Sequence, residues 1–310
     1  MIDILTSLLQ NAVWYATPLM LTAIGGMFSE RSGVVNIGLE GLMTIGAFSA
    51  AVTTIATGNP WIGVLAAIVA GVLFAIPHAV ATISFKADQV VSGVAINFLT
   101  LGVAMYTVKS LYDAGRTPAI KGTFDTIVIP GLSDIPIIGK ALFAVYPTTY
   151  IAFAAVFISY FVLFKTPFGL RLRAVGEHPR AADTMGINVV RMRYTAVLIS
   201  GALAGIGGAG LSIAIGSQFS ETTIAGQGFI ALAALIFGKW HPFGVLGSSL
   251  FFGFAVSLAL TGQVFGLSEY VPSEMLSMVP YILTILALAG FVGRAESPSA
   301  LGKPYDNKGR

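Results

Sequence analysis

The sequence of 310 residues contains no cysteine, and only 10% of its residues are charged. The lack of cysteine excludes disulfide bonds, thiolate metal sites and cysteine nucleophiles. The scarcity of charge excludes an ordinary water-soluble fold, in which about a quarter of the residues are charged. Hydrophobic residues instead make up 55% of the chain. This composition predicts an all-α, polytopic transmembrane bundle, because helices satisfy their own backbone hydrogen bonds in lipid.

Motifs for nucleotide binding and catalysis are also missing. A phosphate-binding loop requires Gly-x-x-x-x-Gly-Lys-Ser/Thr, whereas the Gly-Lys pairs of this chain continue with Ala141, Trp240 and Pro304. The zinc motif His-Glu-x-x-His and the serine-hydrolase motif Gly-x-Ser-x-Gly do not occur either. We therefore expect no enzyme, no metal site and no cofactor bound by this chain. Active transport would need an ion gradient or a separate motor protein.

Apolar stretches long enough to cross a membrane occupy most of the sequence. They lie near residues 12–28, 34–57, 61–84, 88–107, 148–165, 194–216, 225–238, 243–262 and 277–293. A straight span needs about 20 residues, so the short stretch 225–238 is predicted to be a half-helix or re-entrant piece. The pattern predicts about 8–10 helices, some of them short or discontinuous, in a single transmembrane domain over residues 1–293.

The polar connections give the orientation. The segment 165–193 holds six cations against two acids, and positive charge accumulates on the cytoplasmic side of membrane proteins. The loop of about 166–193 and the polar tail 294–310 are therefore predicted to be cytoplasmic. The near-neutral connection of about 108–147 is predicted to lie outside.

The basic loop also contains the signals of a short helix. Pro179 suits the first helical position, where no backbone N–H is needed. Gly186 suits the helix end, where a residue with left-handed backbone closes the last turn. We predict a helix over about Pro179 to Met185, with a face of small residues, on the cytoplasmic surface of the membrane.

A few polar side chains lie within the apolar stretches. Glu40 follows Asn36 by four residues, so the two are predicted to share one helix face. An ionisable group in lipid commonly marks a transport pathway, but Glu40 near the interface can equally be hydrogen-bonded to a neighbouring helix, and both interpretations stay open. For Asn97, an interhelical hydrogen bond is the favoured interpretation. His78 has no second ligand nearby in sequence, which argues against a metal site.

Two segments resemble each other within the chain. Residues 37–45, IGLEGLMTI, are similar to residues 224–232, IAGQGFIAL, which sets Glu40 opposite Gln227. Internal repeats with discontinuous helices are typical of transporters. Our hypothesis is that Glu40 and Gln227 lie at related places near a translocation path. Glycines such as Gly201 and Gly205, four residues apart, predict close helix packing.

Several longer segments carry a resemblance to a known family. Residues 32–48, 90–102, 166–193, 199–209 and 228–244 resemble permease subunits of bacterial ABC importers of the branched-chain amino acid, ribose and nucleoside type. The form NIGLEG is most similar to the simple-sugar and nucleoside branch, which includes guanosine-type systems. The resemblance implies a multi-pass plasma-membrane protein that forms half of a pore for nucleosides. A simple sugar, riboflavin or a branched-chain amino acid is the alternative solute, and an ion-coupled carrier or channel is the alternative from another class.

The resemblance also implies partners and site residues. The partners would be an ABC ATPase that uses ATP and Mg, a second related permease in a heterodimer or homodimer, an extracytoplasmic solute-binding lipoprotein and membrane lipids, with no nucleic acid. The short loop helix would couple to the ATPase through Glu177, Pro179, Arg180, Ala181, Ala182, Asp183, Met185 and Gly186. Candidate residues of the substrate path are Asn36, Glu40, Asn97, Phe98, Phe219 and Gln227.

Overall fold

A computed structural model describes residues 2–136, 138–264, 275, 278, 282–283 and 296–306. The apolar stretch predicted over 277–293 lies largely outside these residues, so its outcome is not described. Seven long helices are present among them: α1 (Ile2–Arg31), α2 (Leu39–Thr57), α3 (Pro60–Ala79), α4 (Gln89–Tyr112), α6 (Pro147–Lys165), α9 (Val189–Gly210) and α11 (Pro242–Val264). Shorter helices are α5 (Ile138–Phe143), α7 (Pro167–Glu177), α8 (Pro179–Thr184) and α10 (Gln227–Phe237).

The remaining regular elements are small. Single π-helical turns, Val80–Ser84 and Leu211–Ile215, extend α3 and α9. Strands β1 (Ile127–Val128) and β2 (Ala144–Val145) form a two-residue antiparallel pair. The prediction of an all-α bundle is therefore confirmed.

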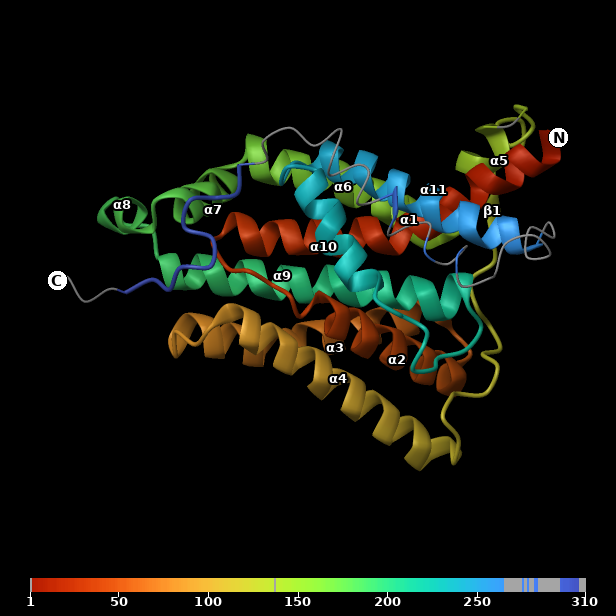
Figure 1. Cartoon of the computed structure of the whole chain (residues 1–310), viewed down its shortest axis with the longest axis horizontal. Helices are drawn as coiled ribbons and strands as arrows, with labels where there is room; N and C mark the ends of the chain where they lie inside the picture. Colours follow the sequence, from red (N-terminus) through yellow and green to blue (C-terminus); the bar gives the residue numbers. More distant parts are fainter. Residues whose placement is uncertain are drawn as a thin grey trace.

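The described helices include six that are long and apolar enough to cross a membrane, namely α2, α3 with its π-turn, α4, α6, α9 with its π-turn, and most of α11. Helix α1 has 30 residues, a length of about 45 Å. It lies inside the bundle in contact with α9, α10 and α11 (Figure 1). Its residues are buried almost without interruption from Val13 to Glu30, so α1 is a central helix of the bundle.

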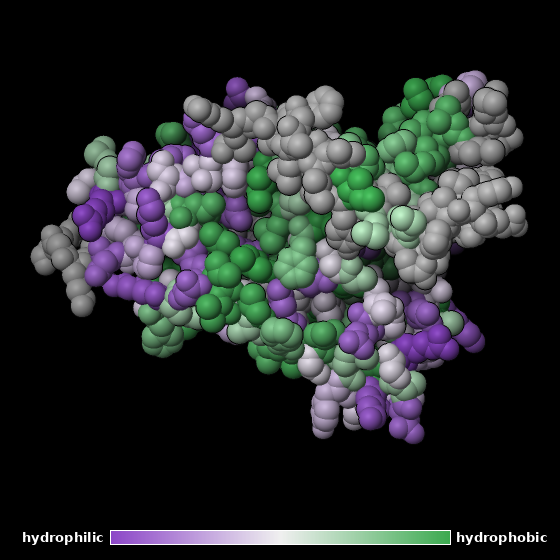
Figure 2. All heavy atoms as spheres, in the orientation of Figure 1, coloured by the Kyte–Doolittle hydropathy of each residue, from purple (hydrophilic) through white to green (hydrophobic). Residues whose placement is uncertain are grey.

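The basic loop and the near-neutral connection lie at opposite ends of the bundle, and which end is cytoplasmic stays a prediction. Helices α7 and α8 lie at the same end as the C-terminus, whereas the N-terminus, α5 and β1 lie at the opposite end (Figure 1). Figure 2 shows hydrophobic side chains across the middle of the molecule, and hydrophilic ones gathered at the end with α7 and α8 and over part of the opposite end. An apolar middle with polar ends is what a bilayer requires of a spanning protein. We refer below to the end with α7 and α8 as the basic end.

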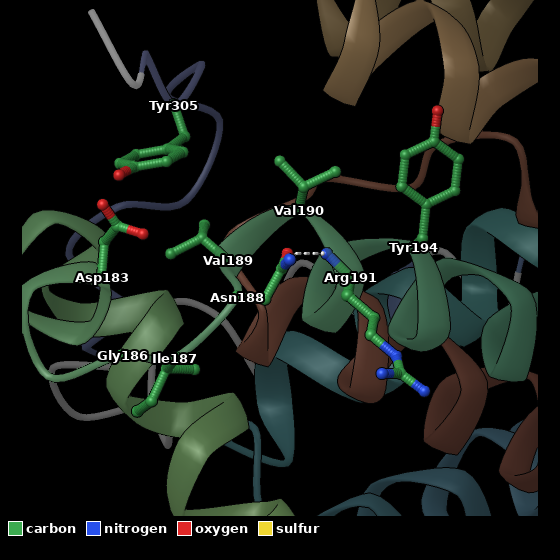
Figure 3. Close-up of a pocket in the computed structure, with 9 residues that line it drawn as sticks. All are labelled: Asp183, Gly186, Ile187, Asn188, Val189, Val190, Arg191, Tyr194 and Tyr305. Atoms are coloured by element: carbon green, nitrogen blue, oxygen red, sulfur yellow. Dashed lines mark hydrogen bonds between the residues drawn. The ribbon is translucent and has the colours of Figure 1, made fainter. Parts of the chain in front are cut away.

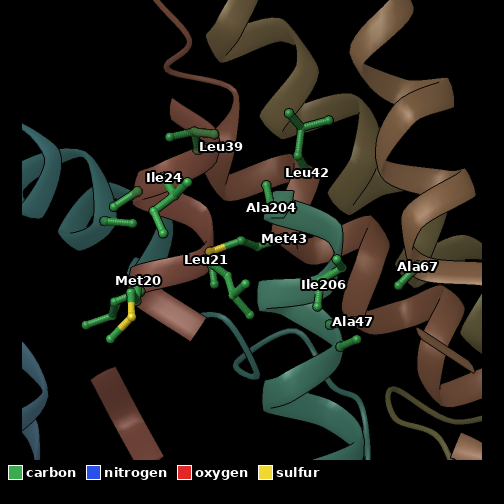
Figure 4. Packing of buried hydrophobic residues seen from close by; sticks show 14 of the residues in the cluster. Met20, Leu21, Ile24, Leu39, Leu42, Met43, Ala47, Ala67, Ala204 and Ile206 are labelled. Atoms are coloured by element: carbon green, nitrogen blue, oxygen red, sulfur yellow. The ribbon is translucent and has the colours of Figure 1, made fainter. Parts of the chain in front are cut away.

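Glycine allows the central helices to approach closely, as predicted. A β-carbon added at Gly201 would collide with the carbonyl oxygen of Gly71, and one added at Gly205 would collide with that of Ala67. Around this contact, side chains of α1, α2 and α9 converge on Met43 (Figure 4). Small residues that let helix backbones touch are a main source of helix association in lipid.

Candidate functional site

Helix α10 is a half-helix, as predicted for the short stretch 225–238. Its 11 residues span about 16 Å, roughly half of the hydrocarbon thickness. Gly226 precedes it in the left-handed conformation, with φ of 87°. The helix contacts α1, α2 and α11, and it runs obliquely across α1 and α9 in Figure 1. It therefore begins within the bundle.

Glu40 holds the start of this half-helix. Its two carboxylate oxygens accept hydrogen bonds from the backbone N–H groups of Gly226, at 2.7 Å, and Gly228, at 2.6 Å. The first N–H groups of a helix have no partner within the helix, and they carry its positive dipole end. A carboxylate supplies both the missing acceptors and the opposite charge. Gly228 is required for this approach, because an added β-carbon would lie 2.5 Å from the backbone nitrogen of Glu40.

The far end of α10 is held by α1. The indole N–H of Trp240 donates to the Glu30 carboxylate at 2.6 Å, and the Arg31 guanidinium donates to the Trp240 carbonyl at 2.9 and 3.0 Å. Lys239 and Trp240 both have positive φ, which marks a tight turn into α11. The half-helix thus has a carboxylate contact at each end, one from α2 and one from α1.

Asn97 makes the interhelical hydrogen bonds that its sequence predicts. From α4, its side-chain oxygen accepts from the N–H of Gly41 at 2.8 Å, and its side-chain nitrogen donates to the carbonyl of Ile37 at 3.1 Å. Asn97 therefore caps the open start of α2 from a neighbouring helix. Its amide is therefore committed to the backbone of α2 through Gly41 and to that of the preceding connection through Ile37.

The predicted helix face shared by Asn36 and Glu40 is wrong. Helix α2 begins only at Leu39, and Asn36 lies in the non-helical connection before it. There the Asn36 side chain is fully buried and donates to the hydroxyl of Ser200 on α9 at 2.9 Å. Side chains from other helices bind the backbone of this connection: Gln89 accepts from the N–H of Val35.

His78 belongs to the same arrangement. Its Nε2 atom lies 3.1 Å from the Val35 carbonyl oxygen, and its Nδ1 atom lies 3.0 Å from the hydroxyl of Ser92. Both ring nitrogens therefore contact groups of the chain. Local sequence pattern could not indicate this role, because Val35 and Ser92 lie 43 and 14 residues away from His78 along the chain.

The other three path candidates differ in exposure. Phe98, on α4, is 72% exposed, whereas Phe219 is fully buried and packs edge-to-face on Phe48 at 5.7 Å between ring centroids. In this conformation, Phe219 is not available to stack on a solute. Gln227 is partly buried at the start of α10, and its side-chain oxygen has no hydrogen-bond partner among the described residues. Gln227 thus retains a side-chain oxygen, and Phe98 an exposed ring, for which the described residues supply no hydrogen-bond partner or full cover.

At the basic end, the predicted loop helix is confirmed as α8. Pro179 is its first residue, and Gly186 follows it with φ of 81°. Met185 is 82% exposed, and Arg180, Ala181 and Gly186 are exposed as well. Helix α8 therefore presents a surface to the solvent beyond the bundle.

Ala182 does not belong to that surface, which corrects the predicted face of small residues. It is only 4% exposed and packs in a small cluster with Val175 of α7 and Val189 of α9. Successive helix residues point about 100° apart, so Ala181 faces outward while Ala182 faces the chain. Ala182 fastens α8 to the bundle.

Glu177 is also engaged within the chain instead of being free for a partner. Its carboxylate accepts from the backbone N–H of Ser299 at 3.1 Å and from the hydroxyl of Ser299 at 2.8 Å. The next residue, Ala300, is buried and donates its N–H to the carbonyl of Gly176 at 2.9 Å. The predicted polar tail therefore lies folded on the basic end over residues 299–306, a segment that we call the C-terminal strap.

Two pockets flank α8. One, of about 610 Å³, lies between the start of α9 and the strap, and its lining includes Asp183, Arg191 and Tyr305. Figure 3 shows Tyr305 beside Asp183, whereas Arg191 points away from both. The side chain of Asn188 caps α9 there by accepting from the N–H of Arg191 at 2.8 Å. The second pocket, of about 510 Å³, lies between α8 and the strap.

The comparisons with known proteins agree on one class. Residues 8–288 match the family described as branched-chain amino acid transport system / permease component. The chain is 56% identical to the guanosine ABC transporter permease protein NupQ of Bacillus subtilis and 46% identical to the nucleoside ABC transporter permease protein NupC of Lactococcus lactis, each over 98% of both chains. It is 25% identical to the guanosine ABC transporter permease protein NupP of Bacillus subtilis, over 90% of this chain and 80% of the relative.

Proposed function

The chain belongs to the family of branched-chain amino acid transport system permease components, and from this premise we propose that it forms half of the pore of an ATP-driven nucleoside importer. It is a multi-pass protein of the plasma membrane. The observation that carries the proposal is α8, a short helix fixed to the basic end whose outer face is open to a partner. A chain without a nucleotide-binding motif needs such a contact to receive work from ATP.

The coupling follows from how α8 is fixed. Ala182 packs on α7 and α9, so a displacement of α8 by the ATPase is passed to α7 and to α9, which continues into the membrane. The outward-facing residues Arg180, Ala181 and Met185 would touch the ATPase. ATP and Mg would bind to that partner, and this chain would carry no cofactor and perform no covalent chemistry.

The solute path is proposed along the start of α10. Gln227 offers an amide oxygen for the hydroxyl or amino groups of a nucleoside, and Phe98 offers a ring on which a base could stack. Glu40 and Asn97 would act indirectly by fixing the helix starts beside that path. Half-helices that begin inside the membrane are the usual setting of transporter binding sites.

Two further partners complete the proposal. Because Bacillus subtilis has two different relatives that are both named guanosine permeases, and this chain is much more similar to one of them, we propose a heterodimer with a second permease. An extracytoplasmic lipoprotein would deliver the solute. The choice of a nucleoside over a sugar or an amino acid as the solute rests on the names of the relatives.

The test is uptake of labelled guanosine into cells that express this chain together with its cognate second permease and ATPase. We expect uptake that excess unlabelled nucleoside suppresses and that excess ribose or leucine does not. Ala181→Arg should abolish uptake and ATPase binding at unchanged membrane levels, whereas Ala181→Ser should behave like the parent. Suppression by ribose or leucine would contradict the substrate, and full activity of Ala181→Arg would contradict the coupling.

A further inference from the structure

The C-terminal strap and α8 enclose one pocket at the basic end, and we infer that this composite surface receives an acidic side chain of the ATPase. This inference rests on the proposed coupling through α8. It adds that the docking surface is incomplete without residues 299–306, which lie more than a hundred positions away in sequence.

The strap is fixed to four parts of the chain. Besides the contacts of Ser299 and Ala300 with the end of α7, the N–H of Gly302 donates to the carbonyl of Gly33 at 3.2 Å. The side chain of Lys86, after α3, forms an ion pair with Asp306 at 2.6 Å. The backbone of the strap therefore has a defined position beside α8.

Arg193 provides the fourth anchor from α9. It is 1% exposed, and its guanidinium donates to the carbonyls of Ser32 at 3.2 Å and Lys303 at 3.1 Å. A buried charge is costly unless hydrogen bonds compensate for it. One of the two compensating acceptors belongs to the strap, so the backbone of Lys303 is held while its side chain stays exposed.

The lining of the pocket between α8 and the strap suits an acidic side chain. Pro179, Ala181 and Pro304 give it an apolar lining, and Arg180 and Lys303 contribute positive charge. Neither cation forms an ion pair within the described part of the chain. Of the two acids on its border, Asp306 is paired with Lys86, whereas Glu177 accepts from Ser299 and keeps its charge, so the two cations outweigh the remaining acid by one charge.

The positive charge of the pocket therefore favours an acidic occupant. Because the pocket lies beside α8, the ATPase is the subunit expected to supply that residue. Attraction between opposite charges across an interface speeds association and fixes its register. It also weakens as salt rises, because exposed charges are screened. An acidic residue of the ATPase seated here would bridge α8 and the strap.

The experiment measures binding of the purified cognate ATPase subunit to the full-length permease complex in nanodiscs at low and high salt. We expect Lys303→Glu and Arg180→Glu each to weaken binding about tenfold or more at low salt and much less at high salt. Lys121→Glu, an exposed reversal in the connection at the opposite end, is the matched control. Unchanged thermal unfolding would exclude a folding defect, since only the carbonyl of Lys303 contacts Arg193.

The outcomes separate this inference from the proposed function. If Ala181→Arg blocks ATPase binding while Lys303→Glu leaves it unchanged, the composite surface is refuted and coupling through α8 stands. If neither change affects binding, both are refuted. If Lys303→Glu alters only the dependence on anionic phospholipid in the nanodisc, the surface serves lipid and the inference is overturned.

Discussion

Replacing Glu40 by Gln tests whether a carboxylate holds the half-helix α10. The substitution keeps the side-chain shape, but it removes the charge and replaces one of two acceptor oxygens with an NH₂ group. One of the bonds to Gly226 and Gly228 is then lost. A hydrogen bond to a charged group contributes about 1.5–3 kcal/mol. Because each 1.4 kcal/mol is a factor of ten, local opening at the start of α10 should rise by roughly 10- to 150-fold.

Hydrogen–deuterium exchange of peptides that cover residues 226–232 measures this opening. We expect faster exchange there in Glu40→Gln and unchanged exchange in the core of α9. Glu221→Gln is the matched control, because Glu221 is exposed in the connection just before α10. If both variants exchange like the parent at residues 226–229, the Glu40 carboxylate does not stabilise the half-helix, and the reasoning fails.

Three further changes probe other contacts. Arg193→Ala should remove two charge-assisted hydrogen bonds and destabilise the strap by about 2–5 kcal/mol, which would make residues 299–306 sensitive to protease. Arg193→Lys should not restore protection from protease, because lysine lacks the planar guanidinium that binds two acceptors. Ala182→Leu should lower the thermal midpoint through overpacking of about 1–3 kcal/mol, whereas Ala181→Leu should not. Gly228→Ala should destabilise by a similar amount through its clash with Glu40, and Gly247→Ala, where a β-carbon meets no atom within 4 Å, should be neutral.

Much of the architecture could be predicted because lipid imposes simple rules. Length and hydropathy located the spans, the shortness of 225–238 indicated a half-helix, and Pro179 with Gly186 indicated α8. The similarity of residues 37–45 to 224–232 set Glu40 against Gln227, and the structure brings these helix starts into contact. Whether the solute passes there stays a prediction.

The wrong details share one physical cause, which is contact between residues distant in sequence. Helical periodicity placed Asn36 on a helix, but its amide binds Ser200, and α2 starts later. Ala182 looked available for docking, but Val175 and Val189 cover it. Glu177 looked available for a partner, but Ser299 binds it across 122 residues of sequence. A local sequence pattern cannot show which polar or small side chains will form contacts with distant parts of the same chain.

Because both ends of α10 are anchored, its length must match the distance between the two anchors. Its two ends are fixed to successive helices, at Glu40 on α2 and at Glu30 and Arg31 on α1. One residue added to or removed from α10 would shift an end by about 1.5 Å and rotate it by about 100°. Either anchor would then miss its target. The number of residues from Gly226 to Trp240 is therefore as constrained as their identity, and α1, α2 and α10 are expected to move as one rigid body.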